Sequence, residues 1–425
     1  MKYRLSEINI SQHGKIHVPN VIHFVWVGDT NRVNMEYIDI WKKTNKDKEV
    51  YFWHDEHASL CNLLHDAIRE YVLLNDFDNN VHAEIWMKNK AFNYIFPKLK
   101  DGFYFNDLVV NFLLDNNIPY NCLTSSVLNP RLENEDFIVK NISELFSSEL
   151  CDFMRYYYYE IILRTNLASA SDIVRLLILY QYGGVYIDVD TLPYTDNVFD
   201  RLNQYLEKEK VREDDSLLLF KTKSILKKLS ILDFSDGDYL NNFKNETEVE
   251  RDKYHKILEL IELDIAEFSL KKILPLGNMY VHKNLLAIGS LRRLKGIYFN
   301  NFISSHPGSK VVKIILRTMK KRYAFLEKNN CIFDYYKGGE EAKYLTRILT
   351  WRTELINREY CVTSVLSGPG LIVEVLLGIA YELLDFECVT EPSFIAEYMQ
   401  NDKFGIALFQ HNLDTPDGIY SSWRK

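Results

Sequence analysis

The stretch that decides the fold is "ASASDIVRLLILYQYGGVYIDVD", which runs from Ala168 to Asp190. Its apolar residues Ile173, Leu176 and Leu177 follow the i, i+3, i+4 spacing of one helical face. A Gly-Gly pair then permits a tight turn, and "VYIDVD" has the alternation of a strand. We therefore predict a largely buried helix, a glycine turn and a short strand that ends in two aspartates.

Two serines and two charged residues mark the start of the predicted helix. Ser169 or Ser171 can cap it, because a serine side chain accepts a hydrogen bond from the first free N–H groups. Asp172 suits the positive end of the helix dipole, and Arg175, three residues further on, shares its face. Taken alone, these two charges are an ordinary cap and a surface ion pair.

The strand places its own polar groups on one face. Residues two apart in a strand point the same way, so Tyr186, Asp188 and Asp190 should face one side. Two neighbouring carboxylates repel each other unless a cation lies between them. A D-x-D triplet alone is a weak sign of a metal site, and the chain has two others in polar settings. The triplet at Asp188–Asp190 is a stronger sign of a metal site, because a helix, a glycine turn and an apolar strand precede it.

Upstream segments predict the rest of the sheet. "VIHFVWVG", Val21–Gly28, is a short apolar run typical of a buried strand. The following "VNMEYIDIWKK" places Met35, Ile38 and Trp41 on one helical face, and "EVYFWHD", Glu49–Asp55, reads as a second strand. This βαβ start predicts a parallel sheet with helices on both sides.

The longer stretches are mainly helical in pattern. Residues 58–165 favour helices, and we expect the tyrosine run at 156–159 to turn its rings alternately to core and surface. "GDYLNNFKNETEVERDKYHK", residues 237–256, is polar and predicts a surface excursion. "GSKVVKIILRTMKKRYAFLEK", residues 308–328, alternates apolar and basic residues with helical period and predicts a long amphipathic helix.

Composition excludes several classes of protein. With 51 Lys+Arg against 59 Asp+Glu, the formal charge is −8, and no long basic block suggests nucleic acid as a partner. The first residues lack the apolar core of a secretory signal, and no stretch reaches the length of a membrane span. The six cysteines are scattered without a C-x-x-C pair, which argues against zinc and a disulfide scaffold and for reduced thiols.

The helix–turn–strand string resembles the donor-binding core of GT-A glycosyltransferases. Two branches share it: capsule- and mannan-type sugar transferases, and the glycosylating domain of the large clostridial cytotoxins and related bacterial effectors. Four further segments resemble the toxin branch in its own order, namely "IHFVWVG" from Ile22, the helix from Gly308, "VLSGPG" from Val365 and the terminal "YSSWRK". This resemblance implies an α/β fold of GT-A type, Rossmann-like, with a mixed, mostly parallel sheet, helices on both faces and extra helical insertions.

The resemblance also implies a domain plan. Residues 1–425 would form one glycosyltransferase domain with its core at about 18–310. A helical insertion at about 60–165 would split the core, and a helical and lid part would follow at about 308–425.

By the same resemblance, four residues contact the nucleotide of a UDP-sugar. Trp26 would stack on the uracil while the Val25 backbone reads the edge of the base. Leu167 and Ser171 correspond to ribose and base contacts. Without the resemblance, Trp26 would read as a core residue.

The sugar of the donor would meet a second group. Asp172 and Arg175 would hold sugar hydroxyls, since a carboxylate and a guanidinium offer acceptors and a planar donor fork to a polyol. Tyr186 would lie beside them, and Asn300 aligns with an asparagine that touches the transferred sugar. An asparagine in a loop would otherwise be a simple turn former.

A divalent ion and a lid complete the implied site. Asp190 is the expected direct Mn²⁺ (or Mg²⁺) ligand, and Asp188 would contact the sugar and ribose or reach the metal through water. Ser421 would face the metal and Trp423 the β-phosphate and glycosidic oxygen. The metal would be a Lewis acid that stabilises UDP as leaving group. The implied catalytic set is Asp172, Arg175, Asp188, Asp190, Asn300 and Trp423.

Two positions depart from the family pattern. Gly418 stands where the family usually has a glutamate metal ligand, and the adjacent Asp417 is the candidate replacement. His57 stands where an asparagine is common after the second strand.

The expected function is that of a retaining, metal-dependent toxin or effector glycosyltransferase. Its donor would be UDP-glucose first and UDP-N-acetylglucosamine second, and its acceptor a hydroxyl of a host protein, a small GTPase of Rho or Ras type. A bacterium would secrete it without a cleavable signal, and it would act in the host cytosol. Two alternatives stay open: a polysaccharide or capsule sugar transferase of the bacterium itself, and a non-catalytic UDP-sugar-binding pseudoenzyme.

Overall fold

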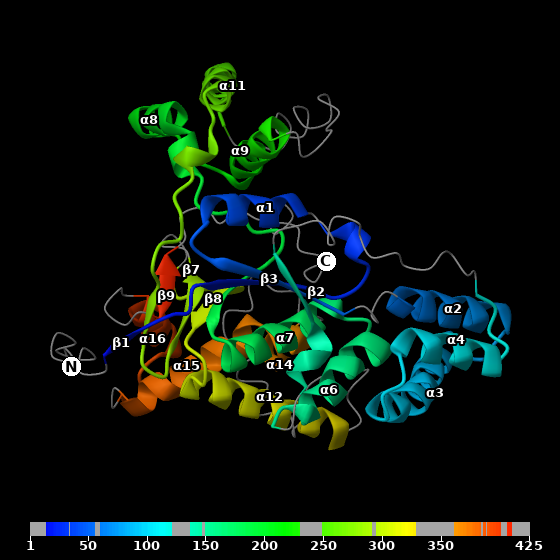
Figure 1. The fold of residues 1–425 in the computed structure, drawn as a ribbon. Coiled ribbons are helices and arrows are strands. Elements are labelled where there is room, and N and C mark those ends of the chain that lie inside the picture. Colours follow the sequence, from blue (N-terminus) through cyan, green and yellow to red (C-terminus); the bar gives the residue numbers. More distant parts are fainter. Residues whose placement is uncertain are drawn as a thin grey trace.

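A central sheet organises the chain, seen in a computed structural model (Figure 1). The structure describes residues 14–33, 35–55, 60–120, 137–146, 149–229, 249–290, 295–328, 361–383, 386–387, 389–400 and 406–409. Its strands are β1 (Lys15–His17), β2 (Val21–Trp26), β3 (Glu49–His54), β4 (Ile138–Asn141), β5 (Gly184–Ile187), β6 (Tyr280–His282), β7 (Leu286–Ser290), β8 (Tyr298–Ser305) and β9 (Ala407–Phe409).

Helices cover the sheet and extend beyond it. The α-helices are α1 (Met35–Thr44), α2 (Cys61–Leu74), α3 (Asn80–Lys100), α4 (Phe105–Asp115), α6 (Cys151–Tyr158), α7 (Leu167–Gln181), α8 (Asp200–Lys208), α9 (Asp215–Lys228), α11 (Arg251–Ala266), α12 (Lys310–Lys328), α14 (Cys361–Leu366), α15 (Pro369–Leu383) and α16 (Pro392–Met399). No helix in the described ranges is long and apolar enough to cross a membrane.

The main sheet has seven strands in the order β4-β3-β2-β5-β8-β7-β9. The pairs from β4 to β5 are parallel, as is β7 with β9, whereas β8 runs antiparallel to both of its neighbours. The expected mixed, mostly parallel sheet of an α/β fold is therefore confirmed. A separate two-stranded ribbon pairs β1 with β6.

The predicted βαβ start is confirmed. Residues of β2 alternate between two cores, because Ile22 and Phe24 pack with Ile38 and Trp41 of α1 on one face. Val25 lies in the other large cluster, together with the helices below the sheet. Figure 1 shows α1 above the sheet and α7, α12 and α15 beneath it.

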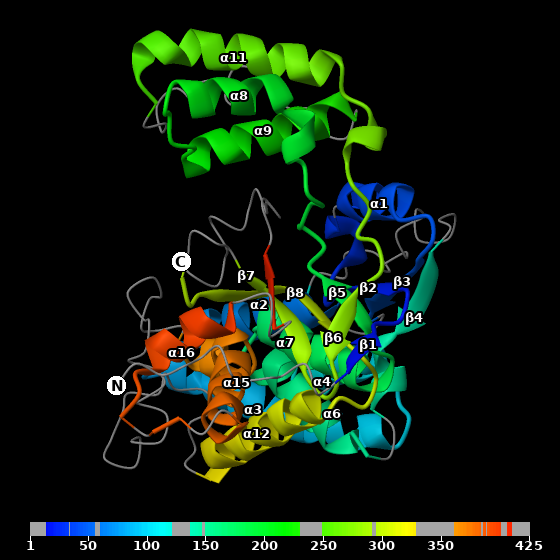
Figure 2. The ribbon, with the colours of Figure 1, turned by 90° about the vertical axis from the view of Figure 1, so that its left-hand side faces the viewer.

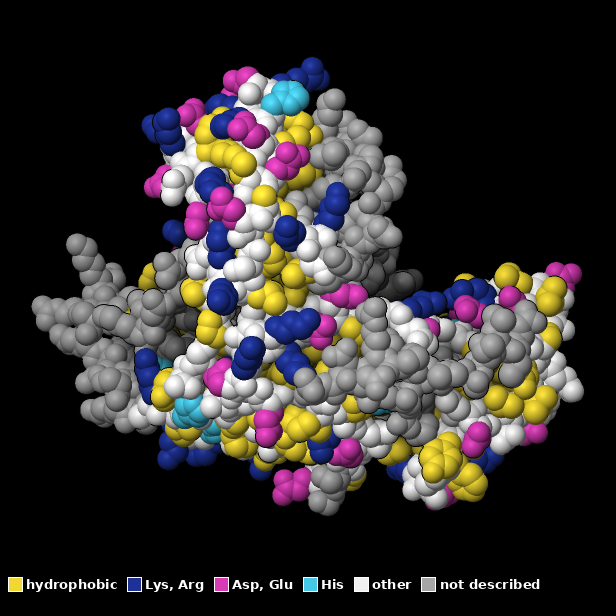
Figure 3. All heavy atoms as spheres, turned by 45° about the horizontal axis from the view of Figure 1, so that its top comes forward, with side chains coloured by type: hydrophobic (Ala, Val, Ile, Leu, Met, Phe, Trp, Pro, Cys, Tyr) yellow, Lys and Arg dark blue, Asp and Glu magenta, His cyan; other side chains and the backbone are white. Residues whose placement is uncertain are grey.

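The segment predicted to be mostly helical at 58–165 is mainly helical in its described residues, where it also contains the strand β4. Its helices α2, α3 and α4 pack together at one end of the molecule, and Figure 3 shows hydrophobic side chains on the surface there. The strand β4 lies at the edge of the main sheet beside β3. Its four residues are exposed or half-buried, so they lack the apolar run by which a buried strand is predicted.

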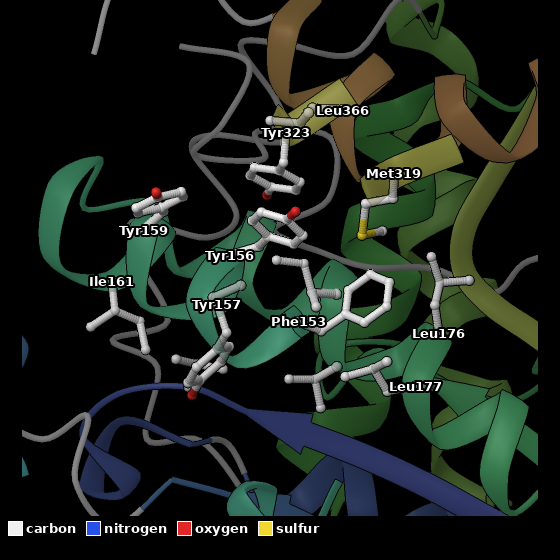
Figure 4. Packing of buried hydrophobic residues seen from close by; sticks show 14 of the residues in the cluster. Phe153, Tyr156, Tyr157, Tyr159, Ile161, Leu176, Leu177, Met319, Tyr323 and Leu366 are labelled. Atoms are coloured by element: carbon white, nitrogen blue, oxygen red, sulfur yellow. The ribbon is translucent and has the colours of Figure 1, made fainter. Parts of the chain in front are cut away.

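The expectation that the tyrosine run alternates between core and surface is wrong. All four tyrosines of residues 156–159 are buried (Figure 4). The chain changes there from α6 to a π-helix at Tyr159–Leu163, and helices cover it on more than one side. The Tyr156 ring stacks on Tyr323 of α12 at 4.6 Å, while Tyr158 stacks on Phe105 of α4 at 5.8 Å. A run that packs between two helices needs no exposed face.

Helices α8, α9 and α11 form a group of their own above α1 (Figure 2). They share a hydrophobic cluster that also includes Tyr37 and Ile40 on the outer face of α1. The polar stretch predicted as a surface excursion at 237–256 ends in α11, and its residues 237–248 lie outside the described ranges. Its described residues 249–256 are exposed or half-buried, as predicted. Beyond the stretch, α11 becomes amphipathic, since Ile257, Leu260 and Ile261 are buried.

The C-terminal part returns to the sheet. The predicted amphipathic helix at 308–328 is confirmed as α12, which buries Val312, Ile315 and Met319. α12 packs against α7 and α15 beneath the sheet. The short strand β9 adds to β7 at the far edge from β4, so residues after 361 complete the core.

Candidate active site

Helix α7 begins earlier than predicted, because its cap lies three residues before Ser169 and five before Ser171. Its cap is Asn166, whose side-chain oxygen accepts a hydrogen bond of 3.0 Å from the Ser169 N–H. The prediction of a cap by Ser169 or Ser171 is therefore wrong. Ser169 is fully buried instead, and its hydroxyl lies 2.6 Å from that of Ser367. Asparagine caps as well as serine does, so the alternative was present in the sequence.

The glycine pair between α7 and β5 is required by its surroundings. Gly183 and Gly184 have φ values of +65° and +91°, which side chains rarely adopt. A Cβ at Gly183 would lie 2.6 Å from Pro307, and one at Gly184 would lie 2.8 Å from His23. This turn sends the chain from α7 directly into β5, next to β2.

The strand β5 ends at Ile187, before the aspartates. Asp188 still donates its N–H to Asn301 O at 2.9 Å, and Thr191 N–H closes a turn on Asp188 O at 3.0 Å. The D-x-D triplet thus occupies a turn at the carboxyl end of β5, and strand alternation does not extend to Asp190. Tyr186 and Asp188 do share a side, since the Tyr186 hydroxyl donates a hydrogen bond to Asp188 Oδ1.

Arg175 is the centre of the site. Its guanidinium lies 3.1 Å from Asp172 Oδ1 and 3.3 Å from Asp188 Oδ1. It donates a 2.7 Å hydrogen bond to Asn300 O and lies over the Tyr186 ring at 4.5 Å. Burial alone would lower the pKa of Arg175, but the neighbouring acidic groups, Asp188 foremost, raise it above its ordinary value. The side chain is thus a fixed cation that connects α7, β5 and β8.

Asp172 is held from both sides. Asn300 Nδ2 donates to its Oδ1 at 2.8 Å, and the Ser367 hydroxyl donates to its Oδ2 at 3.2 Å. The residue is 6% exposed, so it is no surface ion pair. Burial raises the pKa of Asp172 to about 6, although Arg175 opposes the shift.

Three acidic side chains act on the charge of Arg175. Arg175 faces the carboxylates of Asp172 and Asp188, and Asp190 is also close enough to act on its pKa. Among the described interactions, the charge of Arg175 is thus influenced by three acidic groups at the sheet edge. Asp188 and Asp190 are half-buried rather than enclosed, and carboxylate oxygens are the donors that Mg²⁺ and Mn²⁺ prefer. These two aspartates are therefore suited to a hard divalent ion.

The described residues do not supply a complete metal shell. They contain no group of three or more His, Cys, Asp or Glu side chains placed to hold a metal ion. Further ligands would have to come from a bound nucleotide or from other parts of the chain. Ser421, Trp423, Asp417, Gly418 and His57 all lie outside the described residues.

The predicted nucleotide residues lie on neighbouring elements. Trp26 is the last residue of β2, which runs parallel to β5, so it ends at the same edge of the sheet as Asp188. Its ring is half-buried and donates a 2.8 Å hydrogen bond to Asp29 O. Leu167, at the start of α7, lies against Gly28, where an added Cβ would meet it at 3.2 Å. The strand β2 and the start of α7 thus meet at this edge.

Two further residues predicted to contact the nucleotide are Ser171 and Val25. Ser171 is half-buried on α7, with its hydroxyl 3.5 Å from Arg175 Nη2. Val25 is 4% exposed within β2, one residue before Trp26.

Sequence reasoning assigned no role to Ser367 and Gly368. They lie between α14 and α15, and a Cβ at Gly368 would stand 3.2 Å from Asp172 Oδ2. The hydrogen bond from Ser367 to Asp172 joins residues 195 positions apart. Their position within "VLSGPG" was the signal available, but a sequence does not show which distant side chain a loop reaches.

Comparison with known proteins gives consistent similarities. The family model described as the TcdA/TcdB catalytic glycosyltransferase domain matches residues 20–350. Toxin A of Clostridium novyi is 26% identical over 349 residues, which cover 74% of this chain and 15% of that protein. Toxin B of Clostridioides difficile is 32% identical over 197 residues, which cover 40% and 8%. The chain thus spans at most about a seventh of the length of these curated relatives.

Solved structures agree in fold. The catalytic domain of alpha-toxin from Clostridium novyi superposes with a TM-score of 0.64 at 19% identity, covering 98% of this chain and 81% of that one. The UDP-bound glycosyltransferase domain from the YGT toxin gives 0.58 at 16% identity, covering 96% and 82%. At these identities the likeness concerns the fold alone.

Proposed function

The chain belongs to the TcdA/TcdB catalytic glycosyltransferase domain family, and from that premise we propose that it transfers glucose from UDP-glucose to a hydroxyl of a host protein. UDP-N-acetylglucosamine is the second choice of donor. Asn300 is flanked by Phe299 and Asn301, and these larger side chains favour the smaller sugar. We also propose that residues 1–425 act as one domain, because β9 pairs with β7 and Ser367 reaches Asp172.

One observation carries this proposal: a buried guanidinium joins two carboxylates at the carboxyl edge of the sheet. Arg175 contacts Asp172 and Asp188 within 3.3 Å, and Asn300 bonds to both members of the α7 pair. Substrates of open α/β sheets bind at this edge. Burying these charges costs desolvation free energy, and well-packed apolar residues would stabilise the fold equally well. The charged network therefore points to a role in binding or catalysis.

The sugar would lie against the Asp172, Arg175 and Asn300 group. These side chains offer acceptors and donors at fixed positions, which suits the several hydroxyls of a hexose. Rigid placement matters for catalysis because orientation of the reacting bond lowers the barrier. Trp26, Val25, Leu167, Ser171 and Tyr186 would hold the nucleotide beside it.

We propose Asp190 as direct ligand of Mn²⁺ or Mg²⁺ and Asp188 as its partner. Their half-buried carboxylates, beside the Arg175 cluster at the sheet edge, fit a divalent ion. When bound, such an ion stabilises the negative charge of a departing diphosphate. Asp417 and Ser421 would complete the ligand set, and Trp423 would cover the β-phosphate as part of a lid.

The reaction would retain the anomeric configuration. The bond between the anomeric carbon and the UDP oxygen breaks, and its electron pair leaves with UDP. The acceptor oxygen forms the new bond on the same face, and its proton passes to the departing phosphate. No carboxylate nucleophile is needed on this route. Asp172, Arg175 and Asn300 hold the sugar in place while the bonds exchange.

We propose a Rho- or Ras-type small GTPase as the acceptor, modified in the host cytosol after secretion by a bacterium. Family membership is the support for this acceptor, and the test is direct. The protein is incubated with labelled UDP-glucose or UDP-N-acetylglucosamine, Mn²⁺ and a host-cell lysate, and labelled proteins are identified by mass spectrometry. Asp190→Ala is run in parallel.

Three results can be told apart. A labelled host protein with the wild type and none with Asp190→Ala supports the proposal. UDP release without any labelled protein contradicts the protein acceptor and favours a polysaccharide transferase. Equal UDP release by both proteins, or none by either, contradicts the catalytic role.

A further inference from the structure

The outward face of α12 carries one sign of charge along its whole length. Lys310–Lys328 buries its apolar residues against α7 and α15 and exposes the opposite side. At about 100° per residue the exposed positions fall within an arc of about 120°. They are Lys310, Lys313, Ile314, Arg317, Lys320, Lys321, Ala324 and Lys328. Six cations and no acidic residue thus line a strip about 27 Å long.

Few acidic partners of these cations occur among the residues that the structure describes. Within the described part of the chain, the ion pair formed from this strip joins Lys320 to Asp152 of α6. Lys313 lies 5.9 Å from the Tyr180 ring, which is a weak attraction. The chain as a whole has a net charge of −8, so the strip does not follow from overall composition. By contrast, Figure 3 shows Lys, Arg, Asp and Glu side chains interspersed over α8, α9 and α11.

We propose that this face of α12 docks on an anionic lipid surface. Four to eight Lys and Arg residues on one helix face attract the negative headgroups of a membrane. The composition argues against a protein partner, because protein interfaces favour aromatic residues and Arg and are depleted of Lys. Here five of the six cations are Lys, and the one large apolar side chain exposed among them is Ile314 at 39%.

The position of α12 suits contact with an extended surface. It forms the lower edge of the molecule in two views at right angles (Figures 1 and 2). Apart from Ile314, its large apolar residues pack in the core, so the contact does not depend on insertion into the bilayer. The attraction is therefore electrostatic, reversible and screened by salt. Because α12 packs on α7, which carries Arg175, docking would fix the orientation of the donor site relative to the membrane.

The test is co-sedimentation of the full chain with vesicles. Vesicles of phosphatidylcholine alone are compared with phosphatidylcholine containing phosphatidylserine, each at low and at high salt. We expect binding to the phosphatidylserine vesicles at low salt, loss of that binding at high salt, and none to phosphatidylcholine. No binding to the anionic vesicles at low salt, or equal binding to both vesicles, would overturn the proposal.

A matched pair of variants locates the effect on α12. The triple variant Lys313→Glu, Arg317→Glu and Lys321→Glu should lower the apparent vesicle affinity by about 100-fold or more, since each cation contributes roughly fivefold near an anionic surface. The control, Lys46→Glu, Lys228→Glu and Lys271→Glu, changes net charge equally at exposed positions of other elements. Its affinity should fall by less than about tenfold. Equal losses in both variants would overturn the proposal.

Two further measurements keep the result interpretable. Thermal unfolding and UDP-sugar hydrolysis of the α12 variant should match the wild type, and if they do not, the neutral triple variant to Gln replaces it. The wild type is also tested with duplex DNA at the same salt. Binding to DNA as tight as to the anionic vesicles would mean a general preference for polyanions and would overturn a lipid-docking role.

Discussion

Helix α7 and the turn after β5 both present carboxylates to Arg175, but they hold them differently. Asp172 of α7 is enclosed, with one oxygen bonded to Asn300 and the other to Ser367. Asp188 and Asp190 lie in a turn and are half-buried. The first region is enclosed by the protein itself, whereas the second is half-buried at the sheet edge where a ligand would bind. Changes at Asp172 should therefore affect folding and activity together, and changes at Asp190 should affect mainly activity.

The largest effect on this comparison is expected for Arg175→Ala. It leaves two buried or half-buried carboxylates without their cation, which costs about 3–5 kcal/mol of unfolding free energy. Donor turnover should be lost with it. Urea unfolding and UDP release measure the two effects. Arg175→Lys keeps the charge but loses the planar fork, so it should recover most of the stability and little of the activity. Full activity in Arg175→Lys would contradict the role of the fork.

The next test uses pH. Burial raises the pKa of Asp172 to about 6, so the carboxylate loses its charge as the pH falls through that value. We expect kcat/KM for UDP-sugar hydrolysis to fall about tenfold per pH unit below 6. The free energy of unfolding should instead increase as the pH falls. The folded protein binds the proton more tightly than the unfolded chain, so unfolding free energy decreases by up to about 3 kcal/mol as pH rises from about 4 to 6.

Asp172→Asn is the control for the pH dependence of both kcat/KM and unfolding free energy. The amide does not titrate in this range, so the acid limb near pH 6 should disappear while the overall rate is lower at all pH values. A variant that keeps an unchanged limb near pH 6 would show that another group is responsible.

A smaller effect is expected where the C-terminal part touches α7. Gly368→Ala would place a Cβ 3.2 Å from Asp172 Oδ2 and from Ser364 Cα, and such overpacking costs about 1–3 kcal/mol. Ser367→Ala removes one hydrogen bond to Asp172, worth about 1–2 kcal/mol. Both should lower kcat as well as the urea midpoint. Unchanged kcat in both would separate this loop from the site.

The smallest effect should come from the cap of α7. Asn166→Ala removes the acceptor for the Ser169 N–H and should cost about 1 kcal/mol of unfolding free energy. Asn166→Ser keeps an acceptor and should retain most of that stability. Activity at saturating donor should persist in both, because the cap lies six residues before Asp172 along α7. Identical destabilisation by Ala and Ser would contradict the capping role.

Local periodicity predicted the part of the fold that has local causes. The apolar spacing at Ile173, Leu176 and Leu177 and the glycine pair predicted α7, the turn and β5 in the right order. The alternating strand pattern failed at Ile187, because hydrogen bonding to Asn301 and the Asp188–Thr191 turn end the strand there. These partners are distant or follow the strand, so the strand pattern did not contain them.

Other differences have the same origin. The tyrosines of 156–159 are all buried because α4 and α12 cover them, and neither helix is adjacent in sequence. The strand β4 is assigned by its pairing with β3 and not by its composition. In the site, Asp172, Arg175, Tyr186, Asp188 and Asn300 were predicted through family resemblance and are brought together by the fold. The role of Ser367 was not predicted, since its contact with Asp172 depends on the packing of α14 and α15.

The most direct test of the account is UDP binding by calorimetry, with and without Mn²⁺, for the wild type and Asp190→Asn. The asparagine keeps the size of the side chain and removes its charge. We predict that Mn²⁺ tightens UDP binding to the wild type by roughly tenfold or more and leaves binding to Asp190→Asn unchanged, with equal urea midpoints for the two proteins. A wild type that binds UDP equally with and without Mn²⁺, or a variant that keeps the full Mn²⁺ effect, would contradict the claim that this turn holds the metal and the nucleotide.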